Sequence, residues 1–161
     1  MPDRPTTPPS LQHEIGKKKP FDVPEQEAAL NIVRTAALLT CETHRFFKSY
    51  KLTEASYNAL RILRGHHPTG VPSQTIGEQL TAQVPDVTRL VDRLVQQKLA
   101  ERTRIDTDRR VVIVRITKPG LDLLAKIDKP LIALHLEQLG HLTRTELADL
   151  SRLLTKARHR G

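Results

Sequence analysis

Apolar residues recur every three or four positions along several stretches of the chain, which is the spacing of an amphipathic helix. From Glu25 to about Tyr50 this spacing predicts one long helix. Four apolar or small residues share one of its faces: Leu30, Val33, Ala37 and Cys41. Because such a face must be shielded from water, we expect another surface to cover it.

The next pattern predicts two further helices separated by a loop. Thr53 is placed to cap the first of them, and Leu52 and Tyr57 have the spacing of a hydrophobic staple around that cap. Glycine and proline interrupt the chain over residues 65–72. Ser73 follows where the N-cap of a short helix would lie.

After a turn, a longer helix is predicted from near Pro85 to about Gln97, and its two faces differ. At about 100° per residue, the apolar side chains form one arc: Val87, Leu90, Val91, Leu94 and Val95. Polar side chains lie opposite: Arg89, Asp92, Arg93 and Gln96, with Asp86 and Thr88 at the edges. We therefore expect one face to pack against the protein and the other to face a partner.

A basic hairpin follows this helix. Residues Ala100–Arg104 and Val111–Ile116 are predicted as strands, and the loop between them holds two aspartates and two arginines. The predicted elements thus follow the order of a winged helix-turn-helix: a short helix, a turn, a longer helix and a basic hairpin. The predicted fold class is therefore mainly α with a small β-hairpin (α+β).

The last third of the chain predicts two more helices. One starts near Pro119. The other starts at Thr143, which has the spacing of a capping box with Glu146, and Leu142 and Leu147 have the spacing of a staple. An apolar stripe on this helix must pack on something: Leu147, Leu150, Leu154 and Ala157.

Composition narrows the function. Lys and Arg number 26 against 18 Asp and Glu, so the net charge is +8 and the pI is near 10.0, which suits a polyanionic partner. No apolar run approaches the roughly 20 residues of a membrane span, and no signal peptide is evident, so we expect a soluble cytoplasmic protein. Aromatic anchors for a membrane surface are scarce. Catalytic motifs are not recognisable, so no enzyme, cofactor or metal site is predicted.

The polar face of the longer helix holds the first candidates for reading DNA. Arg89 can bond guanine bidentately, Thr88 can meet a thymine methyl group or a phosphate, and Arg93 is better placed for the backbone. Asp86 can stabilise the start of the helix or accept from cytosine. The alternative is an ordinary surface helix in which Arg89 pairs with Asp92.

The hairpin adds a second basic surface. Five arginines lie within fourteen residues: Arg102, Arg104, Arg109, Arg110 and Arg115. An arginine at the tip of a wing can enter a narrow minor groove, and Asp108 could hold Arg110 in a fixed orientation for this. The alternative is a charged loop whose arginines and aspartates neutralise one another.

The run Asp86-Val87-Thr88-Arg89-Leu90, followed by Asp108-Arg109-Arg110 at this spacing, resembles the MarR family of bacterial transcription regulators over about residues 25–158. The resemblance implies that Asp86, Thr88 and Arg89 read the groove, that Arg110 enters the minor groove and that Asp108 orients it. The expected DNA-binding set is Ser73, Gln74, Thr75, Asp86, Thr88, Arg89, Arg93, Arg104, Asp108, Arg109 and Arg110. Pro85 stands where family members often have Ser, so one phosphate-binding hydroxyl is absent.

The resemblance also implies an organisation and a mechanism. Residues 52–118 would form the winged helix-turn-helix, and residues 24–51 and 119–161 a helical dimerisation region. Residues 1–23 lie outside the resemblance; their prolines, their basic run and their lack of periodicity predict a disordered basic and proline-rich tail. A homodimer would bind double-stranded DNA at a pseudo-palindromic operator as a repressor, and a small-molecule effector would release it.

Two alternatives to this mechanism stay open. The protein could be a nonspecific architectural DNA binder, since its charge alone gives affinity without sequence preference. It could instead be a regulator switched by thiol oxidation or metal through Cys41 and His44, which are three residues apart on one helix. The position of Cys41 on the apolar stripe favours an inert buried thiol.

Overall fold

The structure is a computed structural model that describes residues 9–105 and 108–159, with the backbone alone at 104–105 and 108–111. It divides into two units, Met1–Glu42 and Thr43–Gly161, and each is described by itself. Helix α2, Pro24–Ser49, contributes to both units, with its last residues in the second.

The first unit contains a short helix, α1, Leu11–Glu14, before α2. The Ser10 hydroxyl caps α1, and Leu11 is buried. An ion pair links α1 to α2, with 2.6 Å between Glu14 Oε2 and Arg34 Nε. Residues 9–23 thus contain a short capped helix that an ion pair links to α2.

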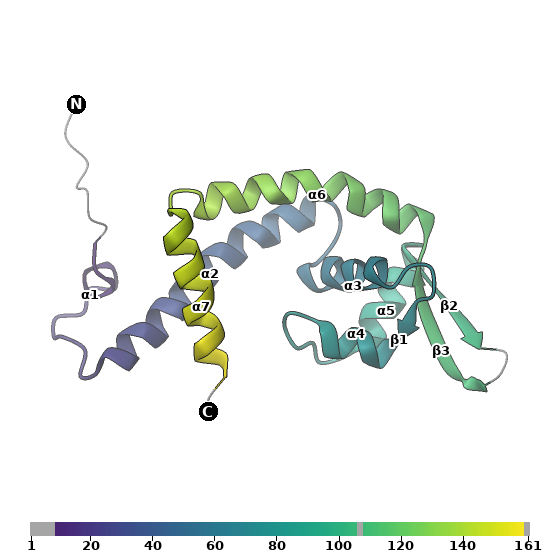
Figure 1. Cartoon of the computed structure of the whole chain (residues 1–161), viewed down its shortest axis with the longest axis horizontal. Helices are drawn as coiled ribbons and strands as arrows, with labels where there is room; N and C mark the ends of the chain where they lie inside the picture. Colours follow the sequence, from purple (N-terminus) through teal and green to yellow (C-terminus); the bar gives the residue numbers. More distant parts are fainter. Residues whose placement is uncertain (1–8, 106–107, 160–161) are drawn as a thin grey trace. The chain divides into compact units, whose positions relative to one another are not determined.

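The second unit carries the remaining elements (Figure 1). Their order along the chain is α3 Glu54–Gly65, β1 Val71–Pro72, α4 Ser73–Gln79, α5 Val87–Gln96, β2 Ala100–Ile105, β3 Asp108–Ile116, α6 Lys118–Leu139 and α7 Arg144–Arg158. This confirms the predicted fold class, mainly α with a small β-hairpin.

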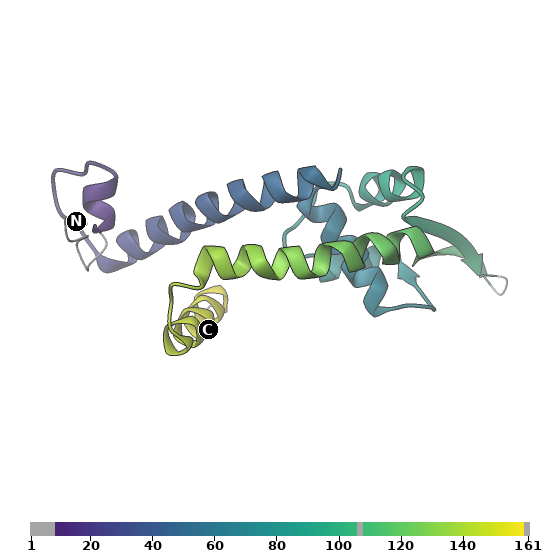
Figure 2. The ribbon, with the colours of Figure 1, turned by 90° about the horizontal axis from the view of Figure 1, so that it is seen from above.

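The sheet has three antiparallel strands in the order β1-β3-β2. Strand β1 has two residues and pairs Val71 with Val114, which tethers the base of the hairpin to the start of α4. The β2–β3 hairpin extends away from the helices of this unit (Figures 1 and 2). Gly70 precedes β1 at a φ of +74°, and a Cβ there would lie 2.4 Å from the Val114 carbonyl oxygen, so the tether requires glycine.

The core of the second unit lies among α3, α4, α5, the sheet and the first half of α6. Its largest enclosed apolar side chains are Phe47, Leu60, Leu63, Ile76, Leu94, Leu124, Ile127, Val91 and Val114. Gly120 admits α6 to this core, since a Cβ at this position would lie 2.3 Å from the Leu99 carbonyl oxygen. The spacing of apolar residues along each helix thus sends them toward one shared interior.

The predicted caps agree with the structure at two helices and differ at a third. The Thr53 hydroxyl caps α3, and Thr143 caps α7 in a capping box with Glu146. Ser73, expected to be an N-cap, is instead the first residue of α4, which has no side-chain cap. Helix α5 starts next to Pro85, as predicted, with Asp86 as its N-cap.

Helix α6 starts at Lys118, next to the predicted start near Pro119, and continues through Pro130 to Leu139. Proline has no N–H, so the helix loses one backbone hydrogen bond at this point. Two residues earlier, Asp128 Oδ2 accepts a hydrogen bond of 2.7 Å from Arg64 Nη1 on α3. This hydrogen bond raises the pKa of the Arg64 guanidinium and joins α6 to the helix-turn-helix.

Several apolar side chains of the long helices are exposed. They are Leu30, Ile32, Val33 and Leu38 on α2, Ile132 and Leu136 on α6, and Leu150 and Leu153 on α7. Cys41 is exposed as well, so the prediction of a buried thiol is wrong for the isolated chain. Leu30 and Val33, on the same stripe as Cys41, are among these exposed side chains.

Candidate nucleic-acid interface

Helix α5 has the two faces that its sequence predicted. Leu90, Val91 and Leu94 are buried in the core. Thr88, Arg89, Arg93 and Gln96 are exposed on the other side. A helix of this kind, following α4 across a turn, offers its exposed face to a groove or a surface.

Asp86 holds the start of α5 and the first arginine on it. Its Oδ1 accepts a hydrogen bond of 2.9 Å from the Arg89 backbone N–H, and its Oδ2 lies 3.3 Å from Arg89 Nε. The Arg89 side chain is nevertheless 86% exposed. The alternative pairing of Arg89 with Asp92 is therefore wrong, because the N-cap places the Asp86 carboxylate closer to the same guanidinium.

Asp92 instead pairs with Arg102, which reaches it from strand β2. Arg102 Nη1 donates to Asp92 Oδ1, and Nη2 donates to the Thr88 carbonyl oxygen at 3.5 Å. Beside this contact lies a hollow of about 480 Å³ lined by Ser73, Thr88, Arg102 and Val112. The starts of α4 and α5 and the base of the hairpin thus meet around one concave surface.

The other predicted DNA-binding residues lie on α4 and on the hairpin. Ser73, Gln74 and Thr75 form the first turn of α4, where Gln74 Nε2 donates to Glu78 Oε1 at 2.9 Å. The side chains of Arg104, Asp108, Arg109 and Arg110 fall outside the described part of the structure. Their backbone places Arg104 on β2 and the other three at the start of β3.

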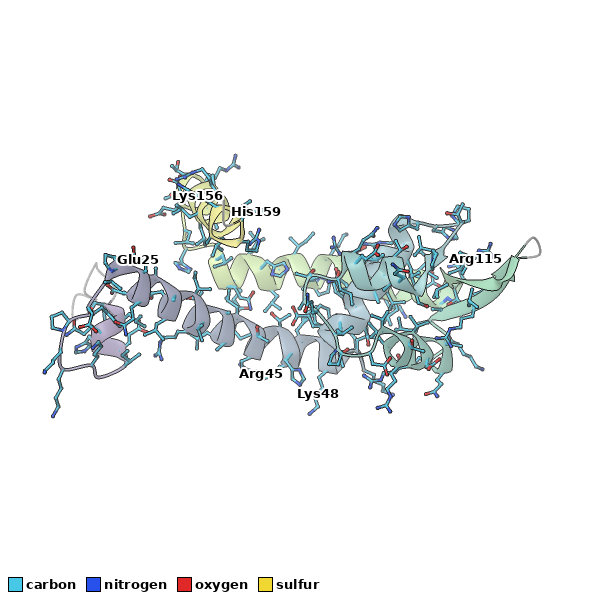
Figure 3. All side chains as sticks on the ribbon, turned by 90° about the horizontal axis from the view of Figure 1, so that it is seen from below. Glu25, Arg45, Lys48, Arg115, Lys156 and His159 are labelled. Carbon is cyan, nitrogen blue, oxygen red and sulfur yellow. The ribbon has the colours of Figure 1, made fainter. Side chains whose placement is uncertain are left out.

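Arg115 shows how one hairpin arginine is used inside the protein. Figure 3 labels it on β3, and its Nε donates to the Thr69 carbonyl oxygen at 3.0 Å. Arg45 and Lys48, also labelled there, lie near the end of α2. The five arginines of the hairpin segment therefore do not form one equivalent set, since Arg102 and Arg115 are engaged within the fold.

A second hollow, of about 240 Å³, lies in the same unit between α3 and α6. It is lined by Thr43, Phe47, Glu54, Tyr57, Asn58, Arg61, Thr81, Leu131 and His135. Asn58 is buried, and its Nδ2 donates to Thr81 Oγ1 at 2.5 Å, but its Oδ1 lacks a partner among the described residues. Burial, and secondarily the charge of Asp128, raises the pKa of the Tyr57 phenol, so that hydroxyl stays protonated at neutral pH.

Metal binding and membrane spanning were also considered for the described residues. There, the side chains of His, Cys, Asp and Glu form no group of three that could hold a metal ion. Within the same ranges no helix is long and apolar enough to cross a membrane.

Comparison with known proteins decides the family. The model of the MarR family matches residues 52–112. A MarR transcription factor from Planctomyces limnophilus, known from its crystal structure, is 40% identical, with a TM-score of 0.67 over 84% of this chain and 98% of that one. The transcriptional regulator MhqR of Bacillus subtilis is 30% identical over 105 residues, which are 64% of this chain and 71% of that relative. This chain belongs to the MarR family.

As a MarR-family protein it is a DNA-binding transcription regulator and not an enzyme. A mutant MarR from E. coli complexed with operator DNA shares the fold, with a TM-score of 0.72 at 24% identity over 91% of this chain and 97% of that one. The resemblance in the sequence was carried by residues 86–90, at the start of α5, and residues 108–110, at the start of β3. Both segments lie inside the matched range.

Proposed function

We propose that this MarR-family protein is a dimeric, sequence-specific repressor that binds a pseudo-palindromic operator and is released by a small molecule. The observation that carries the proposal is the outward face of α5, where Thr88, Arg89 and Arg93 lie beside a projecting basic hairpin. A helix of this size fits the major groove, and a hairpin next to it can follow the adjoining minor groove.

The proposal gives each of the predicted DNA-binding residues a role. Arg89 reads a base, and to do so it exchanges the Asp86 carboxylate for guanine O6 and N7. Thr88 and Arg93 contact the backbone or a thymine methyl group, and Ser73, Gln74 and Thr75 contact phosphates beside α4. For the wing we keep the assignment of Arg110 to the minor groove with Asp108 as its orienting partner, together with Arg104 and Arg109.

In the proposed domain division, residues 52–118 bind DNA. Residues 24–51 and 119–161 together form the dimer interface. Its support is the set of exposed apolar side chains on α2, α6 and α7, which a second copy would cover. On α7, Leu153 is 53% exposed, and Lys156 is an exposed neighbour that carries charge.

Sedimentation measures the oligomeric state of two variants of α7. We expect Leu153→Glu to be a monomer and Lys156→Glu to remain a dimer. If both variants are monomers, or both are dimers, the domain division is contradicted.

The effector site of this function is the hollow between α3 and α6. Asn58 on its lining is buried, and its Oδ1 is an acceptor without a partner among the described residues. Arg61 and His135 on the lining suit an anionic group, and Phe47 and Leu131 suit an apolar body. A protein that shares the fold at 19% identity and a TM-score of 0.76, the organohalide-sensing RdhR, is known in a form that binds 2,4-dichlorophenol.

A panel of phenols and aromatic carboxylic acids tests this site by the melting temperature of the protein and by its release from DNA. We expect at least one compound to raise the melting temperature and to promote release from DNA. We expect Arg61→Gln to weaken the binding of the acids more than the binding of the phenols. If none of the panel changes either quantity, the effector part of the proposal fails while DNA binding stands. The thiol or metal switch through Cys41 and His44 stays an untested prediction.

The central test is the specificity ratio. Duplexes selected by the full-length protein from a random-sequence pool are compared with scrambled duplexes by fluorescence anisotropy at about 150 mM salt. A sequence-specific regulator should prefer its selected duplex by roughly 10³ or more. A ratio near one would reject the proposal in favour of nonspecific architectural binding.

A further inference from the structure

Arg102 connects the hairpin to α5 through two acceptors that lie one helical turn apart. It lies on β2 opposite Val114, within the paired part of the sheet. Its guanidinium donates to the Asp92 carboxylate and to the Thr88 carbonyl oxygen. Because the guanidinium is planar and its donors are fixed in direction, this contact constrains rotation and sliding of α5 in a way that apolar packing does not.

We infer that Arg102 is a positioning residue that sets the orientation of α5 relative to the wing, and that DNA recognition depends on its pair with Asp92; this inference rests on the proposed function. The pair has a second effect. Asp92 lies near the exposed face of α5, and an unpaired carboxylate there would repel DNA phosphate. Arg102 neutralises it without itself being needed at the DNA.

The surroundings separate Arg102 from an ordinary phosphate-binding arginine. Its side chain is 33% exposed, against 86% for Arg89, and both of its terminal nitrogens already donate within the protein. Arg93 lies on the polar side of α5 and forms no ion pair with another described residue. It provides the matched comparison as a residue expected to meet phosphate.

The experiment uses the full-length protein, the duplex it selects from a random pool, and a scrambled duplex. Four variants are compared: Arg102→Gln, Asp92→Asn, the double variant, and Arg93→Gln. We expect Arg102→Gln and Asp92→Asn each to weaken the selected duplex about 10-fold, and the double variant to be no weaker than the single ones, as for two residues in one contact. Arg93→Gln should weaken both duplexes and lower the salt slope by about 1.

Asp92→Asn is the decisive variant because simple electrostatics predicts the opposite sign for it. Removing a negative charge near DNA should strengthen binding if Arg102 only contacts phosphate, since the substitution also frees that arginine. A positioning role requires weaker binding of the selected duplex and no weakening of the scrambled one. Asp92→Asn binding the selected duplex as tightly as the unaltered protein would overturn the inference.

Hydrogen exchange without DNA gives an independent readout. The amides of 87–96 should exchange faster in Arg102→Gln and Asp92→Asn than in the unaltered protein, and at an unchanged rate in Arg93→Gln. If no sequence is selected at all, the proposed function fails, yet the exchange rates still decide whether Arg102 holds α5; unchanged rates would overturn that role. If thermal melting shows that Arg102→Gln does not fold, both measurements, DNA affinity and hydrogen exchange, are made on Asp92→Asn.

Discussion

Asp86 offers the sharpest test of how α5 begins. Replacing it with alanine removes the acceptor for the Arg89 backbone N–H, a hydrogen bond of 2.9 Å, and leaves an orphan donor at the helix start. Loss of an N-cap destabilises a protein by about 1 kcal/mol. The ion pair with Arg89 adds little, about 0.3 kcal/mol, because both side chains are well exposed.

Asparagine at this position separates the two contributions. Asp86→Asn keeps an oxygen acceptor for the cap but loses the charge, so we expect it to lower the free energy of unfolding by only about 0.3 kcal/mol. Asp86→Ala should lower it by about 1.3 kcal/mol, which corresponds to a drop in melting temperature of roughly 3–5 °C for a chain of this size.

Urea unfolding at one fixed protein concentration measures both variants, with a common m-value as the check that only stability has changed. Protein concentration is fixed because a dimer would make the midpoint concentration-dependent. Equal losses for alanine and asparagine would mean that charge, and not the cap, holds the helix start. Two variants as stable as the parent would falsify the cap itself.

Three further predictions concern the rest of the fold. Gly120→Ala places a Cβ 2.3 Å from the Leu99 carbonyl oxygen, so we expect a loss of about 1–3 kcal/mol in chemical denaturation, whereas Gly65→Ala, where a Cβ meets nothing within 4 Å, should be neutral or slightly stabilising. Leu94→Ala, at a fully buried position, should lose about 2–5 kcal/mol by the same measurement, and a loss near zero would show that α5 does not pack as described. Hydrogen bonds from the Thr143 backbone N–H and hydroxyl lower the pKa of Glu146, so its folded pKa lies below its unfolded one. Its stabilising contribution is therefore present above the unfolded pKa of about 4.3 and is lost as pH falls through the folded pKa. The stability difference between the parent and Glu146→Gln should shrink between about pH 6 and about pH 2, and a constant difference would contradict the capping-box assignment.

Local signals in the sequence were enough for much of the fold. The caps at Thr53 and Thr143 depend on a few neighbouring residues, and the two faces of α5 depend only on helical period. Both therefore could be predicted. Strand β1 could not, because two residues carry no period and Val71 becomes a strand only through its pairing with Val114.

Other features depend on partners that are distant in the sequence. Helix α6 continues through Pro130, because the burial of Leu124, Ile127 and Leu131 outweighs one lost backbone hydrogen bond. The pairing of Asp92 with Arg102 brings together residues ten positions apart on different elements, whereas sequence spacing suggested Arg89. Helical period alone also does not say whether a stripe meets its own chain or another copy, as Cys41 shows.

Because α6 is long, a small tilt near the helix-turn-helix would produce a larger displacement at the far end of the helix. With 22 residues the helix is about 33 Å long. The eleven residues that follow Asp128 span about 17 Å, so a tilt of about 10° that begins there would move the far end by about 3 Å. Pro130 lies just past the middle of this lever, where a missing backbone hydrogen bond lowers bending stiffness. A tilt that begins at the contact between Arg64 and Asp128 would therefore partly move the end of α6 and partly bend the helix at Pro130.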